Sequence, residues 1–223
     1  MANTYFSFQQ FTIQQDKSPM KVCTDSCILG AMACVEGKKQ VLDIGTGTGL
    51  LTLMMAQRNP EAYFTALEID ALSVEQAQKN FAQSPWSDRL KVIGCSLQAF
   101  SSGFVDKKFD FIVSNPPFFS NHLKPHSKST KIALHNDDTL PFEDLCHYTE
   151  PLLAENGEIL VMYPGYEANL FLEKARAYGL ICVEKIQIKH YPEADKIFRT
   201  IVKLRKVSSA GICLELVFHI CNA

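Results

Sequence analysis

The stretch VSNPPFF, residues 113–119, places an amide, two prolines and two aromatic rings directly after an apolar run. The side-chain oxygen of Asn115 and the carbonyl of Pro116 can accept hydrogen bonds from an amino group conjugated to a flat ring. Two such acceptors fix the orientation of the amine and favour the positive charge that builds on its nitrogen as a methyl group arrives. Pro116 and Pro117 would stiffen the loop, and Phe118 would stack on a planar base. The residues therefore predict N-methylation, with rate supplied mainly by alignment.

A second candidate is the glycine-rich loop in LDIGTGTGLL, residues 42–51. Its three glycines at positions 45, 47 and 49 allow a tight turn and a close approach of ligand to backbone. Asp43 could accept hydrogen bonds from the loop or from a cationic ligand group. Glu68 ends the next strand-like run, where an acidic residue can accept both hydroxyls of a ribose.

The spacing of the glycines indicates which nucleotide is bound. A dinucleotide fingerprint needs GxGxxG, but Leu50 stands where its last glycine would be. A GxGxG loop suits a ligand without pyrophosphate, and S-adenosylmethionine is the usual one. Taken alone, the glycines could merely join a strand to a helix, and the prolines could merely end a strand. Their order, with Glu68 between them, favours nucleoside binding, and a dehydrogenase is the minor alternative.

The elements that must position these residues alternate along the chain. Strand-like runs cover residues 40–45, 62–69, 89–94, 108–114 and 157–163, and helical stretches lie near 50–57, 71–83, 143–153 and 165–178. This order predicts parallel strands joined by crossover helices. Two strand-like runs, 181–191 and 198–207, then follow each other without a helix, and 211–220 is a possible third. Residues 20–35 resemble an extra helix led in by a loop.

We therefore expect an α/β fold of the Rossmann-like type. Its mostly parallel seven-stranded sheet should carry helices on both faces and end in an antiparallel hairpin. The whole chain, residues 1–223, is expected to form a single domain. Within it, residues 1–37 would be an N-terminal extension or lid helix, and residues 38–223 would be the core.

The bulk composition limits the classes of protein that fit. The chain has 223 residues, 47% of them hydrophobic, which is enough for one large core. It lacks an apolar run of about eighteen residues that could span a membrane, and its first residues lack the pattern of a secretory signal. Eight cysteines without CxxC spacing favour a reducing cytoplasm, and six histidines lack metal-ligand spacing, so we expect no metal. A formal charge of −2 argues against indiscriminate nucleic-acid binding but not against a local basic surface.

The motifs resemble those of class I methyltransferases of the amino-methylating kind, whose (D/N)PP(Y/F) pattern matches residues 115–118. The ordered set FSFQQFTIQQDKSPMKVCTD, VLDIGTGTGLLTLMMAQR, QSPWSDRL, IVSNPPFF and LHNDDTLPFEDL is similar to the bacterial tRNA-valine adenine-37 N6-methyltransferase family. The similarity runs from about Phe6 to the region of Arg199. The MKV-TD and QSPW segments are its more specific parts, because the other motifs occur across the superfamily.

The resemblance implies methyl transfer from S-adenosylmethionine to N6 of the adenine just 3′ of the valine tRNA anticodon. Residues Asn115, Pro116, Pro117 and Phe118 would hold that adenine. Asp43 and the glycine loop would hold the methionine part of the cofactor, Glu68 its ribose, and Thr24 and Asp25 would lie near it as a lid. The implied cofactor-binding set is Thr24, Asp25, Asp43, Gly45, Thr46, Gly47, Gly49, Glu68, Ile69, Ser96, Leu97 and Asn115.

Three features depart from the family pattern. Ser96 stands where such enzymes commonly carry an acid that holds the amino group of the cofactor's adenine, so this contact should be weaker or made elsewhere. Phe118 replaces the commoner tyrosine. The chain also ends in LVFHICNA, without the tyrosine-containing helical tail of the family.

Two basic stretches are candidates for contact with tRNA phosphates. Residues 115–136 contain no Asp or Glu but carry Lys124, Lys128, Lys131, His122, His126 and His135. Residues 196–206 also lack acids and carry Lys196, Arg199, Lys203, Arg205 and Lys206. An ordinary solvated loop and an edge strand kept soluble by charge explain them about equally well.

Other functions stay open from the motifs alone. NPP loops also orient the exocyclic amine of guanine in ribosomal RNA and the side-chain amide of glutamine in translation factors. A cofactor-binding, RNA-associated module without turnover is the alternative from another class. The sequence leaves the oligomeric state open.

Overall fold

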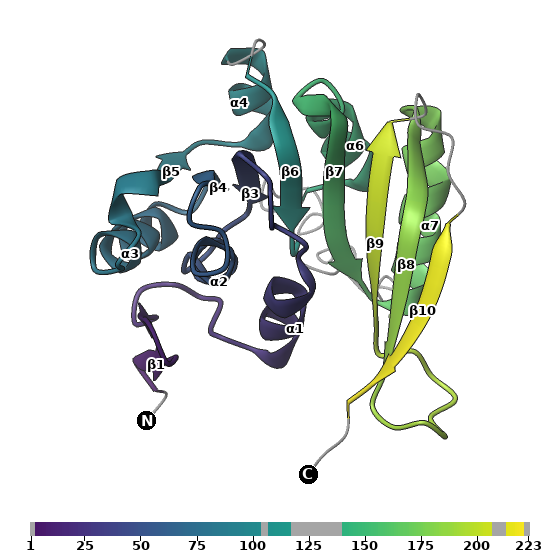
Figure 1. The fold of residues 1–223 in the computed structure, drawn as a ribbon, viewed down its shortest axis with the longest axis horizontal. Coiled ribbons are helices and arrows are strands. Elements are labelled where there is room, and N and C mark those ends of the chain that lie inside the picture. Colours follow the sequence, from purple (N-terminus) through teal and green to yellow (C-terminus); the bar gives the residue numbers. More distant parts are fainter. Residues whose placement is uncertain (1–2, 104–106, 117–139, 207–212, 221–223) are drawn as a thin grey trace, which may run out of the picture.

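The computed structural model describes residues 3–103, 107–116, 140–206 and 213–220. Its centre is an eight-stranded sheet with the order β10-β8-β9-β7-β6-β3-β4-β5 (Figure 1). The strands are β3 (Gln40–Ile44), β4 (Tyr63–Glu68), β5 (Leu90–Gly94), β6 (Phe109–Ser114), β7 (Leu153–Tyr163), β8 (Leu180–Lys189), β9 (Arg199–Lys206) and β10 (Leu214–His219). Strands β3 to β7 are mutually parallel, whereas β9 runs antiparallel to both β7 and β8.

Helices cover both faces of the sheet, as the sequence predicts. One face packs against α1 (Thr24–Met32), α2 (Leu50–Ala56) and α3 (Ala71–Ala82). The other packs against α4 (Leu97–Gly103), α6 (Phe142–Thr149) and α7 (Gly165–Ala177). A short 3-10 helix, η1 (Ser87–Arg89), precedes β5.

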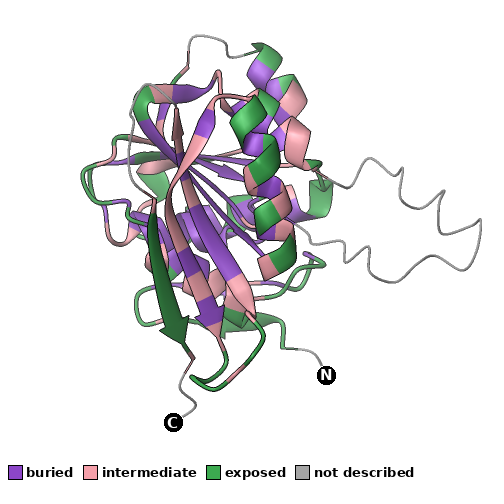
Figure 2. Ribbon diagram, turned by 90° about the vertical axis from the view of Figure 1, so that its right-hand side faces the viewer, coloured by how far each residue is buried: buried purple, intermediate pink, exposed green. Residues whose placement is uncertain are grey.

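The central strands are apolar on both faces because both faces are covered. In β3, Val41 packs on the side of α2 and Leu42 on the side of α6 and α7. In β6, Phe111 and Ile112 divide in the same way. Figure 2 shows the resulting band of buried residues through the middle strands. This layered arrangement confirms the expected Rossmann-like fold.

The structure differs from the sequence-based expectation in its details. The sheet has eight strands within the described residues instead of seven, because the possible third run near the end supplies β10, which pairs parallel to β8. All six residues of β10 are exposed (Figure 2). The helix expected over 143–153 ends at Thr149, since β7 begins at Leu153, opposite Phe109 of β6. Helix α4 and a small hairpin, β1 (Tyr5–Ser7) with β2 (Thr12–Gln14), were not predicted.

The sheet places several loops at one edge. Strands β3, β4, β5 and β6 are parallel neighbours, so the loops that follow them meet at their carboxyl ends. Strands β4 and β5 lie on one side of β3, and the chain then crosses from β5 to β6 on its other side. The carboxyl end of β3 is therefore a topological switch point, where open α/β sheets bind ligands. The glycine loop and the NPP segment both start at this edge.

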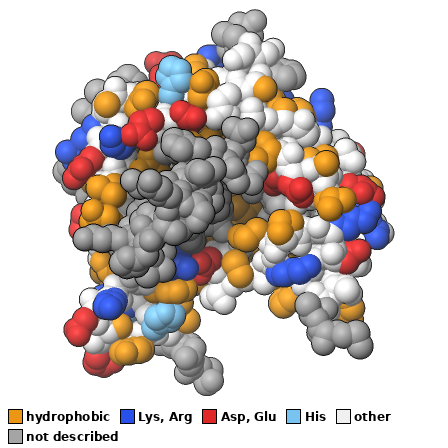
Figure 3. Space-filling view, turned by 180° about the vertical axis from the view of Figure 1, so that it is seen from behind, with side chains coloured by type: hydrophobic (Ala, Val, Ile, Leu, Met, Phe, Trp, Pro, Cys, Tyr) orange, Lys and Arg blue, Asp and Glu red, His pale blue; other side chains and the backbone are white. Residues whose placement is uncertain are grey.

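Charged side chains are interspersed on the described part of the surface in Figure 3, where Lys and Arg lie among Asp and Glu. Within the described ranges, none of the helices has both the length and the apolar character to cross a bilayer.

Candidate functional site

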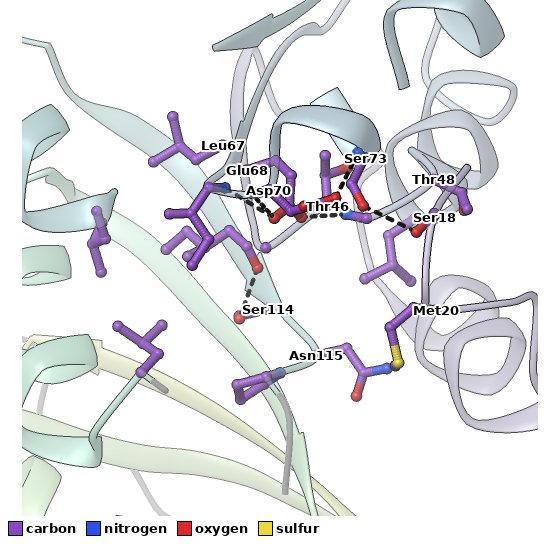
Figure 4. A pocket seen from close by; sticks show the side chains of 18 of the residues that line it. Ser18, Met20, Thr46, Thr48, Leu67, Glu68, Asp70, Ser73, Ser114 and Asn115 are labelled. Carbon is purple, nitrogen blue, oxygen red and sulfur yellow. Dashed lines mark hydrogen bonds between the residues drawn. The ribbon is translucent and has the colours of Figure 1, made fainter. Parts of the chain in front are cut away.

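A cavity of about 260 Å³ opens at the carboxyl ends of β3 to β6 (Figure 4). It lies close to the size, roughly 300 Å³, at which small-molecule sites begin. Glu68, the last residue of β4, and Asn115, which follows β6, both line it. The other predicted site residues on its wall are Gly45, Thr46, Gly47, Ile69, Ser96, Leu97 and Pro116. The structure thus brings most of the expected set into one cavity.

The glycine loop joins β3 to α2 through left-handed backbone. Gly47 has φ 56°, and a side chain added there would meet no atom within 4 Å. Gly49 has φ 86° and caps α2, but an added Cβ would lie 2.5 Å from the ring atom Cε1 of Phe81 on α3. Gly49 therefore permits the packing of α3 against the loop, and it does not line the cavity. Gly47 leaves the cavity wall as bare backbone that a ligand can approach closely.

Glu68 connects the end of β4 to the glycine loop. Its Oε2 accepts the backbone N–H of Gly47 at 2.8 Å, and its Oε1 accepts those of Ile69 at 2.9 Å and Asp70 at 3.0 Å (Figure 4). The carboxylate is thereby held in one orientation at the cavity wall. These bonds use three of the roughly four lone-pair sites of the carboxylate, so Oε2 can still accept a hydrogen bond from a ligand hydroxyl.

Asp43 lies beneath the loop and does not line the cavity. Its Oδ2 accepts hydrogen bonds from Oγ1 of Thr46 at 2.6 Å and of Thr52 at 2.8 Å, while the residue is fully buried. Burial raises the pKa of this carboxyl to about 6; the two threonine hydroxyls oppose the shift and Glu68 adds to it. In this position Asp43 supports the loop from the core side.

Asn115 follows β6 directly. Its Nδ2 donates to Oγ of Ser26 at 3.2 Å, and its Oδ1 is buried without a hydrogen-bond partner among the described residues. Ser114, one residue earlier, donates its hydroxyl to the carbonyl of Ile44 at 2.9 Å and so joins β6 to β3. Pro116 also lines the cavity. The predicted residues Pro117 and Phe118 lie outside the described residues, as does the basic segment after them.

The first turn of α1 reaches the site, but through a different residue than the sequence suggests. Thr24 and Asp25 are absent from the cavity lining, whereas Ser26 belongs to it. The carboxylate Oδ2 of Asp25 accepts instead from Nε of Arg199 at 2.7 Å, at the start of β9. The contact of Thr24 and Asp25 with a cofactor stays a prediction.

The wall after β5 has Ser96 at the position of the family's acid and an amide, Gln98, two residues later. Ser96 accepts the backbone N–H of Ala99 on its Oγ at 3.2 Å and so caps α4. Gln98 also lines the cavity, and its Nε2 donates to Asp144 Oδ2 at 3.0 Å. Because its nitrogen is engaged there, Oε1 is the remaining acceptor of this amide.

Several cavity residues were missed by sequence reasoning. They are Ser18, Pro19, Met20, Lys21, Ser26, Asp70, Ser73, Gln98 and Leu140, among others. Asp70 had a local signal: it caps α3 by accepting the N–H of Ser73 at 2.8 Å, a familiar helix-start pattern. Met20 and Lys21 belong to the MKV-TD segment of the resemblance, but no local pattern places residues 18–21 at the cavity, since only the tertiary fold brings this loop over the sheet.

Most of the second basic stretch is already paired with acids. Arg199, Lys203, Arg205 and Lys206 form ion pairs with Asp25, Glu184, Glu158 and Glu150, respectively. Their charge is neutralised within the fold, which favours the structural explanation of this stretch over a phosphate track. No cluster of three or more metal-ligating side chains occurs in the described part of the chain.

Comparison with known proteins agrees with this geometry. The methyltransferase small domain family matches residues 25–140. A tRNA1(Val) (adenine(37)-N6)-methyltransferase of Trichodesmium erythraeum is 45% identical over 195 residues, 86% of this chain and 81% of the relative. The protein of the same name from Phocaeicola vulgatus is 47% identical over 180 residues, 81% of this chain and 75% of the relative. Among solved structures, the ribosomal protein L11 methylase of Lactobacillus delbrueckii has a TM-score of 0.59 at 18% identity, covering 87% of this chain and 83% of its own.

Proposed function

The chain belongs to the tRNA1(Val) (adenine(37)-N6)-methyltransferase family within the methyltransferase small domain proteins, and we propose that it methylates N6 of adenine 37 in valine tRNA. The methyl donor is S-adenosylmethionine. The name of the relatives supports the substrate, and the cavity supports the chemistry.

The main observation in support of this chemistry concerns the side-chain oxygen of Asn115. It is buried and has no hydrogen-bond partner within the described residues, although it belongs to a residue of the cavity wall. A buried acceptor left unpaired is costly, so the site is complete only when a donor arrives. The N6 amine of adenine is such a donor.

The residues of the cavity fit the proposed cofactor. The carboxylate of Glu68 is oriented by three backbone N–H groups, and its Oε2 can accept a ribose hydroxyl. The bare backbone at Gly45 and Gly47 leaves room for the methionine part. Oε1 of Gln98 is an acceptor for the amino group of the cofactor's adenine, and would take the role that an acid fills elsewhere in the family.

The chain's own groups perform the reaction mainly by positioning. S-adenosylmethionine supplies a methyl group on a positively charged sulfur. Asn115 Oδ1 and the Pro116 carbonyl would accept the two hydrogens of N6, hold the amine in its plane and favour the charge that develops on nitrogen. No general base is needed, because the methylated, cationic nitrogen is acidic enough to lose its proton afterwards. By holding the amine in place against the bound cofactor, these residues would supply the rate mainly through alignment.

The expected division into a lid, residues 1–37, and a core, residues 38–223, stays part of this proposal. Ser18 and Met20 (Figure 4) support it, as does Ser26, because all three contribute to the cavity wall from residues 1–37. The target adenine would leave its stack to enter, which costs least in a single-stranded anticodon loop.

Mass analysis of nucleosides tests the proposal. Valine tRNA lacking the modification is incubated with the protein and S-adenosylmethionine, then digested. We expect one N6-methyladenosine per tRNA, lost when adenine 37 is replaced by guanine. Product at a guanine amine, or on a glutamine side chain in a protein substrate instead, would identify the alternative planar amines and reject this substrate.

A further inference from the structure

The amide of Asn115 has two ends that are easily exchanged but chemically opposite. Its oxygen only accepts hydrogen bonds and its nitrogen only donates them. An amine offers hydrogens, so only the oxygen can hold it in the orientation that the reaction needs. Rotation of the amide by half a turn would place Nδ2 against the amine and remove the acceptor. Something in the protein must therefore select the orientation.

Ser26 is the residue in a position to select it. Its Oγ accepts a hydrogen bond from Asn115 Nδ2 at 3.2 Å, whereas Oδ1 has no partner in the described ranges. The Sγ of Cys23 lies 3.2 Å from the same hydroxyl. A serine hydroxyl carries one hydrogen and two lone pairs, so it can serve Cys23 and still accept from Asn115. Ser26 thus occupies the nitrogen end of the amide.

The first turn of α1, which carries Ser26, is held from outside the helix. Asp25 pairs with Nε of Arg199, and Nη1 of Arg199 donates to the carbonyl of Phe198 at 2.8 Å. The guanidinium carbon also lies 4.1 Å from the centroid of the Phe198 ring. At the other end of the helix, Leu29 is fully buried. The helix start is therefore fixed to the start of β9, far along the chain, and Ser26 is held against the end of β6.

We propose that Ser26 is a positioning residue for the methyl-accepting amine: it fixes the Asn115 amide so that Oδ1 faces the substrate, and the Asp25–Arg199 pair holds it there. This inference rests on the proposed function and adds a residue that lies outside the glycine loop, Glu68 and the NPP segment. Ser26 acts through Asn115 and does not itself touch the reacting atoms.

A double-mutant cycle tests the role. The protein, Ser26→Ala, Asn115→Ala and the double variant are compared by single-turnover methylation of valine tRNA, with the dissociation constant of S-adenosylmethionine and the unfolding midpoint measured for each. We expect Ser26→Ala to slow methyl transfer about tenfold, the effect of leaving one buried donor unpaired. The double variant should be no slower than Asn115→Ala alone, because Ser26 has nothing left to orient.

Matched variants distinguish this positioning role from a general loss of stability. Ser26→Thr keeps the hydroxyl and should restore most of the rate. Ser102→Ala removes an exposed hydroxyl from α4, bonded only to the Gln98 carbonyl among the described residues, and should leave the rate unchanged. The proposal is overturned if Ser26→Ala methylates at the normal rate, or if the rate losses of the two single variants add in the double variant. It is also overturned if the slower rate is accompanied by a matching fall in the unfolding midpoint. Absence of product with the unaltered protein would instead reject the proposed function itself.

Discussion

The Oε2 atom of Glu68 accepts the backbone N–H of Gly47 at 2.8 Å, so the end of β4 and the loop after β3 are joined at the cavity wall. One carboxylate thereby shapes the cofactor cavity and presents the acceptor for the ribose. Substitution of Glu68 therefore removes both roles together.

Replacement of Glu68 by alanine should weaken cofactor binding before it affects anything else. Loss of a charge-assisted hydrogen bond to a ribose hydroxyl is worth about 2–3 kcal/mol, or roughly a hundredfold in the dissociation constant of S-adenosylmethionine. Isothermal titration measures it. Glu75→Ala is the control, since that carboxylate is 59% exposed and pairs only with Lys17 among the described residues. Equal affinity in Glu68→Ala and the unaltered protein would show that Glu68 does not contribute to cofactor binding.

Asp43 should make the stability of the protein depend on pH in an unusual direction. Its folded pKa is raised to about 6 from 3.8, so between these values the native state binds a proton that the unfolded state has released. Stability therefore falls as pH rises through this window, by about 3 kcal/mol in total. The Asn side chain of Asp43→Asn does not titrate. From pH 4 to pH 7, the free energy of unfolding of this variant should therefore rise by that amount relative to that of the unaltered protein. Urea unfolding at several pH values checks this, and a constant difference between the two proteins would contradict it.

The Asp25–Arg199 pair should contribute to stability, because its side chains are only 14% and 20% exposed. Removing one partner leaves a largely buried charge, so Asp25→Asn or Arg199→Gln should each cost about 2 kcal/mol. The double variant should lose clearly less than the sum of the two. Lys17→Gln, at an exposed pair, should cost under about 1 kcal/mol. Additive losses in urea unfolding would show that the two residues act independently.

Gly49 should tolerate a methyl group less well than another left-handed glycine. Gly49→Ala meets both the strain of φ 86° and the Phe81 ring at 2.5 Å, whereas Gly179→Ala meets only the strain of φ 70° in open space. We expect the first to destabilise by about 3 kcal/mol and the second by about 1 kcal/mol. Thermal unfolding of both variants measures the difference. Equal costs would mean that the Phe81 contact yields without penalty.

Local patterns in the sequence were sufficient for the alternating strands and helices and for the motifs at strand ends. Glu68 and Asn115 could be placed at one edge because parallel strands bring their carboxyl ends together. The position of β10 could not be predicted, since a polar-apolar run such as LELVFH does not reveal which strand it will join. Nor could the sequence predict that Ser26 lines the cavity and Asp25 does not, because this depends on how α1 packs against β6 and β9. The pairing of Arg205 with Glu158, from another strand, is equally nonlocal.

The central claim is that Asn115 orients the amine that receives the methyl group. Single-turnover transfer from labelled S-adenosylmethionine to valine tRNA measures it most directly, with Asn115→Ala compared to the unaltered protein at saturating cofactor. Loss of a preorganised polar group of this kind is worth about 2–4 kcal/mol, so the rate should fall by roughly 30- to 1,000-fold. A rate within about twofold of the unaltered protein would contradict the account, because each 1.4 kcal/mol corresponds to about a factor of ten.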